Sequence, residues 1–279
     1  MAVTLIADSG ATKCEWCVLY NGRRKKILTK GISLYFLTAE QTEALIKKEL
    51  LAKIKNILVD EIYFYGTGLG NAKNVSVMRS VLLKIFPGAS IECHTDLLGV
   101  ARALCGSKKG IACILGTGSN SCYYNGKRIV KSIPSLGYVL GDEGSGAYLG
   151  KKVLQHFLYN ELDDKLTQDF ILNFNTNLAT ILEYVYTKPQ PNKYLAGFTI
   201  FLAKNRGHSI IDQITEDGLN DFFVTHLHTY KESWLHPVSF AGSVAFGFRD
   251  IIKKLCSKYE MQLGTILKQP MEELIKYHS

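Results

Sequence analysis

The sequence predicts an α/β protein that is built from two related lobes. Its 279 residues are enough for two hydrophobic cores, because a single core stops growing near ~250–300 residues. Short apolar runs that are typical of strands alternate with segments whose apolar residues recur at helical spacing. In addition, one unit occurs twice, about a hundred residues apart, and such an internal repeat indicates duplicated lobes.

The repeated unit consists of a strand, a loop of small residues, a second strand, a tight turn and a third strand. The turn is Tyr-Asn-Gly-Arg at residues 20–23 and Tyr-Asn-Gly-Lys at residues 124–127. Because Asn-Gly is the strongest short hairpin signal, we expect antiparallel strands around each turn. We place the lobe boundary near residue 106, with an N-terminal lobe of residues 1–106 and a C-terminal lobe of residues 107–279. Whether the final helix, residues 271–278, returns to the first lobe is left open.

In the first lobe, the boundaries of the elements follow from turn and capping residues. Thr38 is a suitable N-cap for the first helix, and Pro87-Gly88 ends the second. We expect strands at residues 3–7, 13–20, 24–28, 62–65 and 91–93. We expect helices at residues 38–57, 75–85 and 96–104.

The second lobe is predicted to be richer in helix. We expect strands at residues 111–115 and 121–124, a further strand after the turn at 124–127, and another strand at 237–241. Segments with helical spacing of apolar residues occur at 145–159, 163–174, 178–186, 194–204, 210–231, 243–259 and 271–277.

Composition and charge exclude several functional classes. The net charge of +8 favours anionic partners such as nucleotides, but we find no basic helix interleaved with aromatic residues and no nucleic-acid-binding motif. No stretch reaches the ~18 uninterrupted apolar residues that a membrane span needs. The apolar stretch at the N-terminus ends at Asp8, which is too short for a signal peptide. We therefore expect a cytoplasmic protein that binds neither nucleic acid nor membranes.

The seven cysteines predict free thiols. An odd number of cysteines without an export signal is typical of a reducing compartment. Cys14 and Cys17 form the CxxC motif of the chain, within a predicted strand. Positions three apart on a strand face opposite sides, so we interpret both as buried small hydrophobic residues rather than as a redox or metal pair.

Two loops of small residues follow strands and could hold phosphate groups. In the first, Ser-Gly-Ala-Thr-Lys at residues 9–13, Gly10 would let backbone N–H groups approach an anion, and Thr12 and Lys13 would add donors. Asp8 precedes this loop, and a carboxylate there is what a Mg²⁺-bound polyphosphate needs. Gly-Thr-Gly-Ser-Asn at residues 116–120 occupies the equivalent place in the second copy. Two such loops facing each other would clamp a phosphate chain.

Asp96 is a candidate general base. It follows a predicted strand and begins a helix, and ligands of α/β sheets bind at such strand ends. The helix dipole favours an ionised carboxylate at this position, which could accept the proton of a hydroxyl group. The alternative is an ordinary N-cap aspartate, and both roles can hold at once.

Two further glycine-containing junctions are candidate binding elements. Gly-Asp-Glu-Gly-Ser-Gly at residues 141–146 precedes a helix, and its glycines predict close approach of the backbone to a ligand; the alternative is an N-cap with acidic residues in the first turn. Ala-Gly-Ser-Val-Ala at residues 241–245 joins a strand to a helix, where glycine would let a flat ligand such as adenine lie against the backbone.

Together and in this order, the motifs resemble the BadF/BadG/BcrA/BcrD-type ATPase family, and within it the N-acetylglucosamine kinase branch. The resemblance extends over nearly the whole chain. It implies two ribonuclease-H-like lobes, each a mixed five-stranded sheet with helices, around a nucleotide cleft, as in actin and hexokinase. It also implies ATP and Mg²⁺ as cofactors and an amino sugar as substrate, phosphorylated at the 6-hydroxyl if the sugar is N-acetylglucosamine. Homodimers are common in the family.

The resemblance implies a role for each matching residue. Asp8 would hold Mg²⁺, and Asp96 would be the base that takes the proton of the sugar hydroxyl. Asn120 and Asp142 would hydrogen-bond the sugar. The residues that would bind the nucleotide are Gly10, Thr12, Lys13, Gly116, Thr117, Gly118, Gly242 and Ser243.

Two departures from the family pattern leave the identity of the amino sugar open. Ser33 stands where relatives commonly carry an asparagine that contacts the sugar, and Leu136 stands where animal relatives carry an aromatic residue. One alternative function is an ATPase that activates a dehydratase through an iron–sulfur cluster, but Cys105 and Cys113 do not form the expected cysteine pair. Another is a sugar-sensing protein that transfers no phosphate, although the intact aspartates argue against it.

Overall fold

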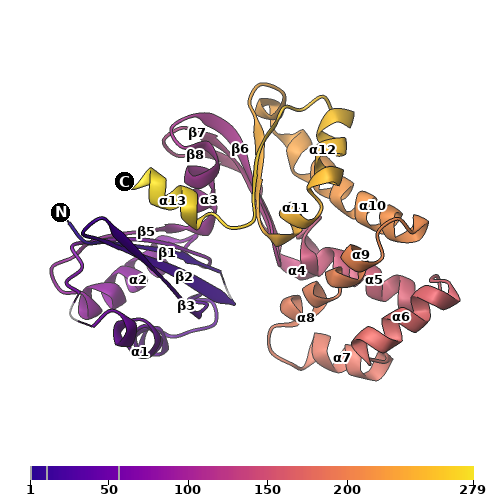
Figure 1. The fold of residues 1–279 in the computed structure, drawn as a ribbon, viewed down its shortest axis with the longest axis horizontal. Helices are drawn as coiled ribbons and strands as arrows, with labels where there is room; N and C mark the ends of the chain where they lie inside the picture. The colour runs from indigo at the N-terminus through magenta and orange to yellow at the C-terminus, as the bar shows by residue number, and fades with distance from the viewer. Residues whose placement is uncertain (1, 11, 56) are drawn as a thin grey trace. The chain divides into compact units, whose positions relative to one another are not determined.

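The computed structural model describes residues 2–10, 12–55 and 57–279. Ala11, in the first predicted phosphate loop, lies outside the described residues. The chain divides into two compact units, one formed by Met1–Ser107 together with Gln269–Ser279 and the other by Lys108–Lys268. The division lies next to the boundary expected from the repeat, and the C-terminal helix, yellow in Figure 1, belongs to the first unit.

The first unit contains a five-stranded mixed sheet in the order β3-β2-β1-β4-β5. Its strands are β1 (Thr4–Ser9), β2 (Lys13–Tyr20), β3 (Arg23–Lys30), β4 (Glu61–Gly66) and β5 (Ser90–Thr95). Its helices are α1 (Ala39–Glu49), α2 (Ala72–Ile85), α3 (Asp96–Cys105) and α13 (Met271–Tyr277), with a short 3₁₀ helix at Leu51–Lys53. In Figure 1, α1 and α2 lie on one face of this sheet and α3 and α13 on the other.

The register of the first sheet brings the ends of three strands into one row. β1 is antiparallel to β2, and the turn between β2 and β3 has positive φ at both Asn21 and Gly22, as the Asn-Gly signal predicts. β1 runs parallel to β4, and β4 runs parallel to β5. Ser9 therefore pairs with Gly66, which pairs with Thr95, so the carboxyl ends of the parallel strands form one edge.

The first helix begins where the sequence predicts and ends earlier. Thr38 is its N-cap and forms a capping box with Gln41. The helix ends at Glu49 and is followed by the 3₁₀ turn, so the predicted extension to residue 57 is wrong. Leu50 and Ile54 are both buried, so the apolar spacing continues through the end of the helix and does not reveal it.

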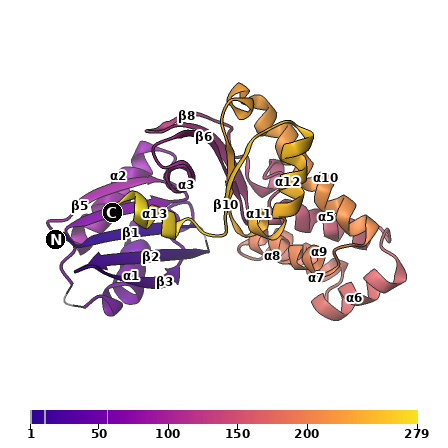
Figure 2. The same cartoon turned by 45° about the horizontal axis from the view of Figure 1, so that its top comes forward.

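The second unit contains another five-stranded mixed sheet, in the order β10-β9-β6-β7-β8. Its strands are β6 (Lys109–Leu115), β7 (Ser119–Asn125), β8 (Ile129–Ser132), β9 (Val238–Ala241) and β10 (Leu263–Leu267). Its helices are α4 (Gly137–Leu140), α5 (Gly146–Leu158), α6 (Asp164–Phe174), α7 (Leu178–Tyr186), α8 (Pro191–Gly197), α9 (Thr199–Lys204), α10 (Ser209–Thr225), α11 (Ser243–Gly247) and α12 (Arg249–Lys258). Figure 2 shows α5–α12 on the same side of this sheet. The α/β class with two mixed sheets is confirmed.

Several predicted helices of the second unit are divided. The segment 194–204 forms α8 and α9, and 243–259 forms α11 and α12, with breaks at Phe198 and Phe248. Both phenylalanines are buried, so the apolar pattern continues across each break. Residues 227–229 and 231–234 form 3₁₀ turns after α10 instead of continuing it. The sequence missed α4 and β10, which are short and partly exposed.

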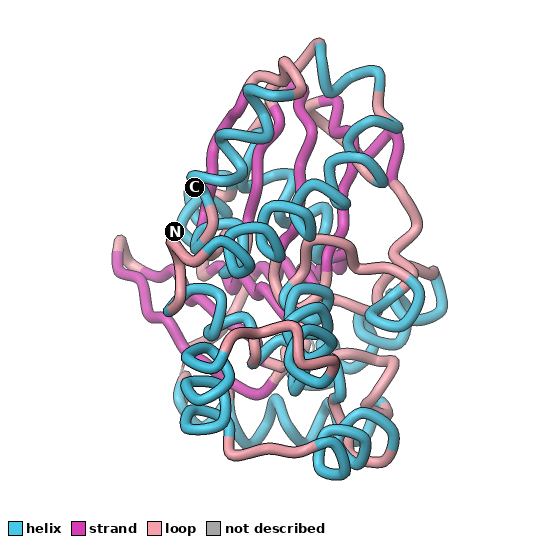
Figure 3. Tube along the Cα trace, turned by 90° about the vertical axis from the view of Figure 1, so that its right-hand side faces the viewer, coloured by secondary structure: helices cyan, strands magenta, loops and turns pink. Residues whose placement is uncertain are grey.

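Each unit has its own hydrophobic core. In the first unit, β1 and β2 contribute residues such as Leu5 and Trp16, which pack against Ile46 of α1 and Met78 of α2. In the second, β6 and β9 pack against α5, α10 and α12. Figure 3 shows the strands of both sheets in magenta and the helices in cyan.

Two sequence-based exclusions can be compared with the structure. Among the residues that the structure describes, no helix has the length and apolar character that a membrane span requires. All seven cysteines lie in described parts of the chain and are free thiols. Cys14 and Cys17 are buried in β2, in agreement with their interpretation as core residues.

Candidate functional site

The first candidate site lies at the strand-end edge of the first sheet. Asp8 is at the end of β1, and Asp96 begins α3 directly after β5. Burial is the main cause that raises the pKa of Asp8 to about 7, and the negative charges of Asp96 and Glu15 add to it, while Lys13 lowers it. Burial also raises the pKa of Asp96. The sheet thus places two carboxyl groups at one edge, and the surroundings of both favour the neutral, protonated form.

Thr95, and not Asp96, is the N-cap of α3. Its side chain accepts a hydrogen bond from the backbone N–H of Leu98 at 3.2 Å. The Oδ1 atom of Asp96 accepts one from the backbone N–H of Leu97 at 2.8 Å. The N-cap alternative for Asp96 is therefore wrong, and its carboxylate keeps acceptor capacity for a ligand.

The first small-residue loop is held by its own hydrogen bonds. The backbone N–H of Gly10 donates to the carbonyl of Lys13 at 3.0 Å, so this N–H group is already used. The hydroxyl of Ser9 accepts from the N–H of Ile32 at 2.9 Å and donates to the carbonyl of Ile32 at 3.1 Å. Gly10 and Lys13 are exposed, and Thr12 is partly exposed. Donors for an anion at this loop would therefore come from Thr12 and Lys13 rather than from the amide of Gly10.

The hydrogen bonds of Ser9 also fix the segment that follows β3. Ser33, the departure noted in the sequence, is buried there. A Cβ atom on Gly68, just after β4, would lie 3.0 Å from its hydroxyl. Tyr35 and Phe36 in the same segment are 66% and 73% exposed. Sequence reasoning did not single out these two aromatic residues at the strand-end edge. Two adjacent aromatic residues in a predicted loop are a signal that could have identified them as candidate ligand contacts.

The second small-residue loop, residues 116–118, is fixed by the start of α5. Its carbonyls accept from the first amides of that helix: Gly116 from Gly146 at 2.8 Å and Thr117 from Ala147 at 3.0 Å. The N–H of Gly116 donates to the carbonyl of Gly118 at 3.0 Å. The loop is therefore held rigidly against the N-terminus of α5, and its carbonyls use the first two backbone N–H groups of that helix.

Asp142 lies beside this loop. It has φ of 58°, and its Oδ1 atom is 3.3 Å from the backbone N–H of Ser119, which donates to it. A Cβ atom on Gly118 would lie 2.9 Å from its Oδ2 atom, so a side chain at residue 118 would displace the carboxylate. Burial is the main cause that raises the pKa of Asp142.

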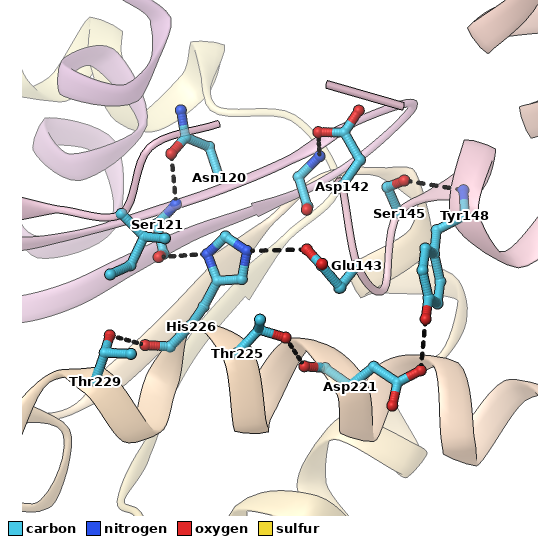
Figure 4. A network of polar contacts seen from close by, with 12 residues as sticks. Asn120, Ser121, Asp142, Glu143, Ser145, Tyr148, Asp221, Thr225, His226 and Thr229 are labelled. Atoms are coloured by element: carbon cyan, nitrogen blue, oxygen red, sulfur yellow. Dashed lines mark hydrogen bonds and ion pairs between the residues drawn. The ribbon is translucent and has the colours of Figure 1, made fainter. Parts of the chain in front are cut away.

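Asn120 is placed differently from the sequence expectation. The loop was expected to extend through it, but Ser119 and Asn120 are the first residues of β7. The Oδ1 atom of Asn120 accepts from the N–H of Ser121 at 2.8 Å. Figure 4 shows Asn120 and Ser121 on adjacent positions of the strand, and such positions point to opposite faces.

Asp142 lies on the wall of a recess of about 50 Å³ in the second unit. This volume has room for a few water molecules or for one polar substituent of a ligand. The lining residues are Ser119, Ile133, Pro134, Ser135, Leu136, Gly141, Asp142, Glu143, Thr225 and His226. The hydroxyl of Ser119 is buried and has no hydrogen-bond partner in the described part of the chain, as expected for a group that binds a ligand. Sequence reasoning did not assign Ser119, Glu143 or His226.

The glycines around Asp142 and at residue 242 serve packing within the protein. A Cβ atom on Gly144 would lie 2.8 Å from Phe222, and one on Gly146 would lie 3.0 Å from Ala196. Gly242 has φ of 128°, and a Cβ atom there would lie 2.2 Å from the carbonyl oxygen of Leu115. Approach of other parts of the chain therefore already requires these glycines. Ser243 begins α11 directly after Gly242.

The predicted residues thus form one group in each unit. The first unit holds Asp8, Gly10, Thr12, Lys13 and Asp96 at one sheet edge. The second unit holds the loop 116–118, Asn120, Asp142, Gly242 and Ser243, and Ile114 pairs with Ala241, so the ends of β6 and β9 are adjacent. Among the described residues, no group of three or more His, Cys, Asp or Glu side chains is arranged to hold a metal ion.

Solved structures resemble the chain over its whole length. A candidate N-acetylglucosamine kinase from Porphyromonas gingivalis has a TM-score of 0.95 and 38% sequence identity, covering 100% of this chain and 98% of its own. A candidate N-acetylglucosamine kinase from Chromobacterium violaceum has a TM-score of 0.78 and 15% identity, covering 100% and 99%. A ROK-family glucokinase from Streptomyces griseus, in complex with glucose and AMPPNP, has a TM-score of 0.58 and 14% identity, covering 99% and 98%.

These structures share the two-lobe fold of sugar kinases and actin-like ATPases, which is thereby confirmed for this chain. No family model and no curated protein sequence matches the chain. The resemblance to the BadF/BadG/BcrA/BcrD-type ATPases therefore stays a prediction, whereas the likeness to N-acetylglucosamine kinases rests on the Porphyromonas gingivalis protein.

Proposed function

The chain belongs to the family of N-acetylglucosamine kinase-like proteins that includes the Porphyromonas gingivalis protein, and from this premise we propose that it transfers a phosphoryl group from ATP to an amino sugar. The observation that carries the proposal is the position of Asp8 and Asp96. Asp8 lies at the end of β1 and Asp96 directly follows β5, the parallel strand on the far side of β4, so both lie at the same strand-end edge, and burial raises the pKa of each. Perturbed carboxylates at strand ends are typical of catalytic sites.

Asp96 would act as the general base. It would accept the proton of the sugar hydroxyl as the oxygen attacks the γ-phosphorus of ATP, and the helix start at α3 favours the ionised form that this role requires. A raised pKa brings the carboxyl group nearer to the operating pH, where a base is most effective.

The residues of the first unit also fit a nucleotide-bound Mg²⁺ ion. Mg²⁺ that binds chiefly phosphate oxygens and water requires only one or two protein carboxylates. Asp8 supplies one such carboxylate, and a bound cation would offset the burial and the charge of Asp96 that raise its pKa. When bound, the ion would neutralise charge that develops on the transferred group. Thr12 and Lys13 would supply donors to the phosphates from the first loop, and residues 116–118 would do so from the second. Gly242 and Ser243 would flank the nucleoside.

The sugar would be bound in part by the second unit. Asp142 would accept hydrogen bonds from its hydroxyl groups, and the buried hydroxyl of Ser119 would join it. A contact from Asn120, the next residue of β7, would come from the opposite face of the strand. We propose N-acetylglucosamine as the first sugar to test and its 6-hydroxyl as the acceptor. Reactions of this kind use cytoplasmic ATP, and the seven free thiols fit a reducing compartment.

The activity can be tested by measuring ADP release over a set of amino sugars, with a control that lacks sugar. We expect ADP release that depends on a sugar, and replacing Asp96 by Asn should reduce turnover by about 10²–10⁴-fold while ATP binding changes little. Glu92→Gln, on exposed surface of the same unit, is the control. Sugar-independent hydrolysis of ATP, or full turnover by Asp96→Asn, would refute the proposal.

The activator alternative needs an iron–sulfur cluster. Such a cluster is bound by thiolates, but burial raises the pKa of Cys105 to about 11. This cysteine therefore favours the protonated thiol, and the structure offers no observation in favour of the alternative.

A further inference from the structure

A buried chain of polar side chains in the second unit leads to Glu143. Ser121 lies on β7, and His226 follows α10. The hydroxyl of Ser121 is 3.0 Å from His226 Nδ1, and His226 Nε2 is 3.5 Å from Glu143 Oε2. Figure 4 shows the imidazole of His226 between Ser121 and Glu143. The imidazole also stacks on Phe222, with 4.5 Å between ring centroids, so its orientation is fixed.

The donors and acceptors of this chain can be assigned. Burial lowers the pKa of His226, so the neutral imidazole, with one N–H group, is favoured. The hydroxyl of Tyr230 accepts from the N–H of Ile133 at 2.9 Å, donates to the carbonyl of Ser121 at 3.0 Å, and lies 3.0 Å from the hydroxyl of Ser121. The hydroxyl of Ser121 is within reach of Nδ1 of His226 as a donor. We assign the N–H group of the imidazole to Nε2, facing Glu143, with Nδ1 as the acceptor.

The opposite assignment is disfavoured by charge. If the proton were at Nδ1, the lone pair at Nε2 would face the carboxylate of Glu143 at 3.5 Å. Two acceptors facing each other in a buried place repel and leave both without a donor. The charge of Glu143 thus favours the tautomer in which Nδ1 accepts from Ser121, in the way a partner sets the tautomer of other histidines.

Glu143 lines the same recess as Asp142 and Ser119. A carboxylate has about four acceptor sites, and His226 has one proton to give. Because Glu143 is partly exposed, its remaining acceptor sites are available to groups that enter the recess. Two adjacent carboxylates and an unpartnered buried hydroxyl suit a ligand that presents several O–H or N–H donors, as a sugar does.

We propose that Glu143 accepts hydrogen bonds from the sugar beside Asp142, and that His226, fixed by Ser121, is the positioning residue that aims Glu143 at it. The inference rests on the proposed sugar kinase activity and adds two residues that determine sugar affinity. Glu143 acts by direct contact, whereas His226 acts only through Glu143. The 3.5 Å separation is long for a hydrogen bond, and we expect it to shorten when the sugar is bound.

The test compares three variants by steady-state kinetics and by calorimetric titration with N-acetylglucosamine. Glu143→Gln keeps the shape but loses the charge, and His226→Phe keeps the ring on Phe222 but loses both nitrogens. We expect each to raise the sugar KM and Kd by about 10–100-fold, the value of hydrogen bonds to a charged group. The turnover number and the KM for ATP should change by less than about 3-fold, because neither residue contacts the transferred group.

The third variant, His226→Gln, provides the rescue. The amide nitrogen of glutamine can replace Nε2 as a donor, so we expect it to restore the sugar KM to within about 5-fold of the wild-type value. His208→Gln and Glu216→Gln, whose parent side chains form ion pairs at the surface of the same unit, are matched controls and should leave the sugar KM unchanged. Thermal unfolding of each variant checks that it is folded.

The outcomes separate the inference from the proposed function. An active wild-type enzyme whose sugar KM is unchanged in Glu143→Gln, or equal in His226→Phe and His226→Gln, overturns the inference alone. A wild-type protein that phosphorylates no sugar overturns the proposed function, and the inference with it. If His226→Phe does not fold, His226→Asn decides: its shorter side chain has no donor at the position of Nε2, so a raised sugar KM supports the inference and an unchanged one overturns it.

Discussion

At the scale of single residues, the site in the first unit holds carboxylates where their charge is unfavourable. Burial, Asp96 and Glu15 raise the pKa of Asp8 to about 7, which means that its ionised form lowers the stability of the folded protein. A residue kept at such a cost is typical of a group that binds a cation or a proton during function. The same reasoning applies to Asp142 in the second unit, because burial raises its pKa as well.

Replacing Asp8 by Asn should therefore separate stability from activity. The amide removes an unfavourable charge, so we expect a higher midpoint of thermal unfolding in the absence of ligand and metal ions. Loss of the Mg²⁺ contact should reduce turnover by about 10²-fold or more. Calorimetry in the presence of a chelator and the ADP-release assay measure the two effects. An active variant that is less stable than the wild type would contradict this reading of Asp8.

His278, next to α13, should give unfolding a defined pH dependence. The hydroxyl of Tyr65 accepts a hydrogen bond from Arg102 at 2.6 Å and forms another with His278 Nε2 at 2.8 Å. Burial, followed by the charge of Arg102, lowers the pKa of His278 to about 4. His94 also lowers it, and Glu92 raises it.

The sign of the effect follows from the two pKa values of His278. The unfolded chain binds the proton near pH 6.5 and the folded chain only near pH 4, so the stabilisation is complete above pH ~6.5 and is lost as the pH falls towards 4. His278→Phe keeps the stacking on Tyr63 and should flatten the curve in this window. Urea unfolding at several pH values measures it, with His208→Gln as control. Equal slopes for wild type and His278→Phe would disprove the assignment.

At the scale of elements, close backbone approach decides which turns are possible. The junction between β9 and α11 passes the end of β6 so closely that a Cβ atom on Gly242 would lie 2.2 Å from the carbonyl oxygen of Leu115. The same residue has φ of 128°, a conformation that is strained for any side chain. Gly242 is therefore a packing requirement of the sheet as well as a candidate nucleotide contact.

Gly242→Ala should destabilise the second unit strongly. Clash and backbone strain together should cost about 3 kcal/mol or more. Gly247→Ala, five residues further along, is the matched control: it has open space around a Cβ atom and no positive φ, so its effect should stay within about 0.5 kcal/mol. Chemical denaturation of both variants tests this. Equal stability of the two variants would show that the turn can rearrange.

The elements that the sequence predicts well are those with local signals. Asn21-Gly22 fixes a hairpin, and Thr38 with Gln41 fixes a helix start, because all the required atoms lie within a few residues. Breaks such as Phe198 have no local signal, because a buried aromatic suits both a continuous and a divided helix. β10 was missed since its residues are only partly buried and its register is interrupted.

The site could be predicted only in part for the same reason. Asp8, Asp96 and Asp142 each follow a strand or stand among glycines, which are features of the local sequence. Ser121 and His226 are separated by 105 positions along the chain, so only the folded structure brings them together behind Glu143. The amide of Gly10 was expected to be free for an anion, but its bond to Lys13 depends on the loop conformation.

At the scale of the whole molecule, the chain forms two compact units whose membership does not follow the sequence order. The first unit includes the last eleven residues, Gln269–Ser279, although the second unit precedes them. Helix α13 packs on α3, β1 and β2, and it buries Met271, Leu274 and Ile275. The end of the chain thus contributes to the sheet that carries Asp8 and Asp96.

Leu274→Ala should accordingly loosen the first unit and leave the second intact. The fully buried leucine leaves a cavity when truncated, which costs about 2–5 kcal/mol. Hydrogen exchange should accelerate in α3, β1 and β2, and amides of β6 and β9 should keep their protection, because their core contains no residue of α13. Leu172→Ala, on an exposed position of α6, is the control that should change neither. Uniform acceleration across both sheets would show instead that the two units unfold as one cooperative structure, and the assignment of α13 to the first unit alone would then fail.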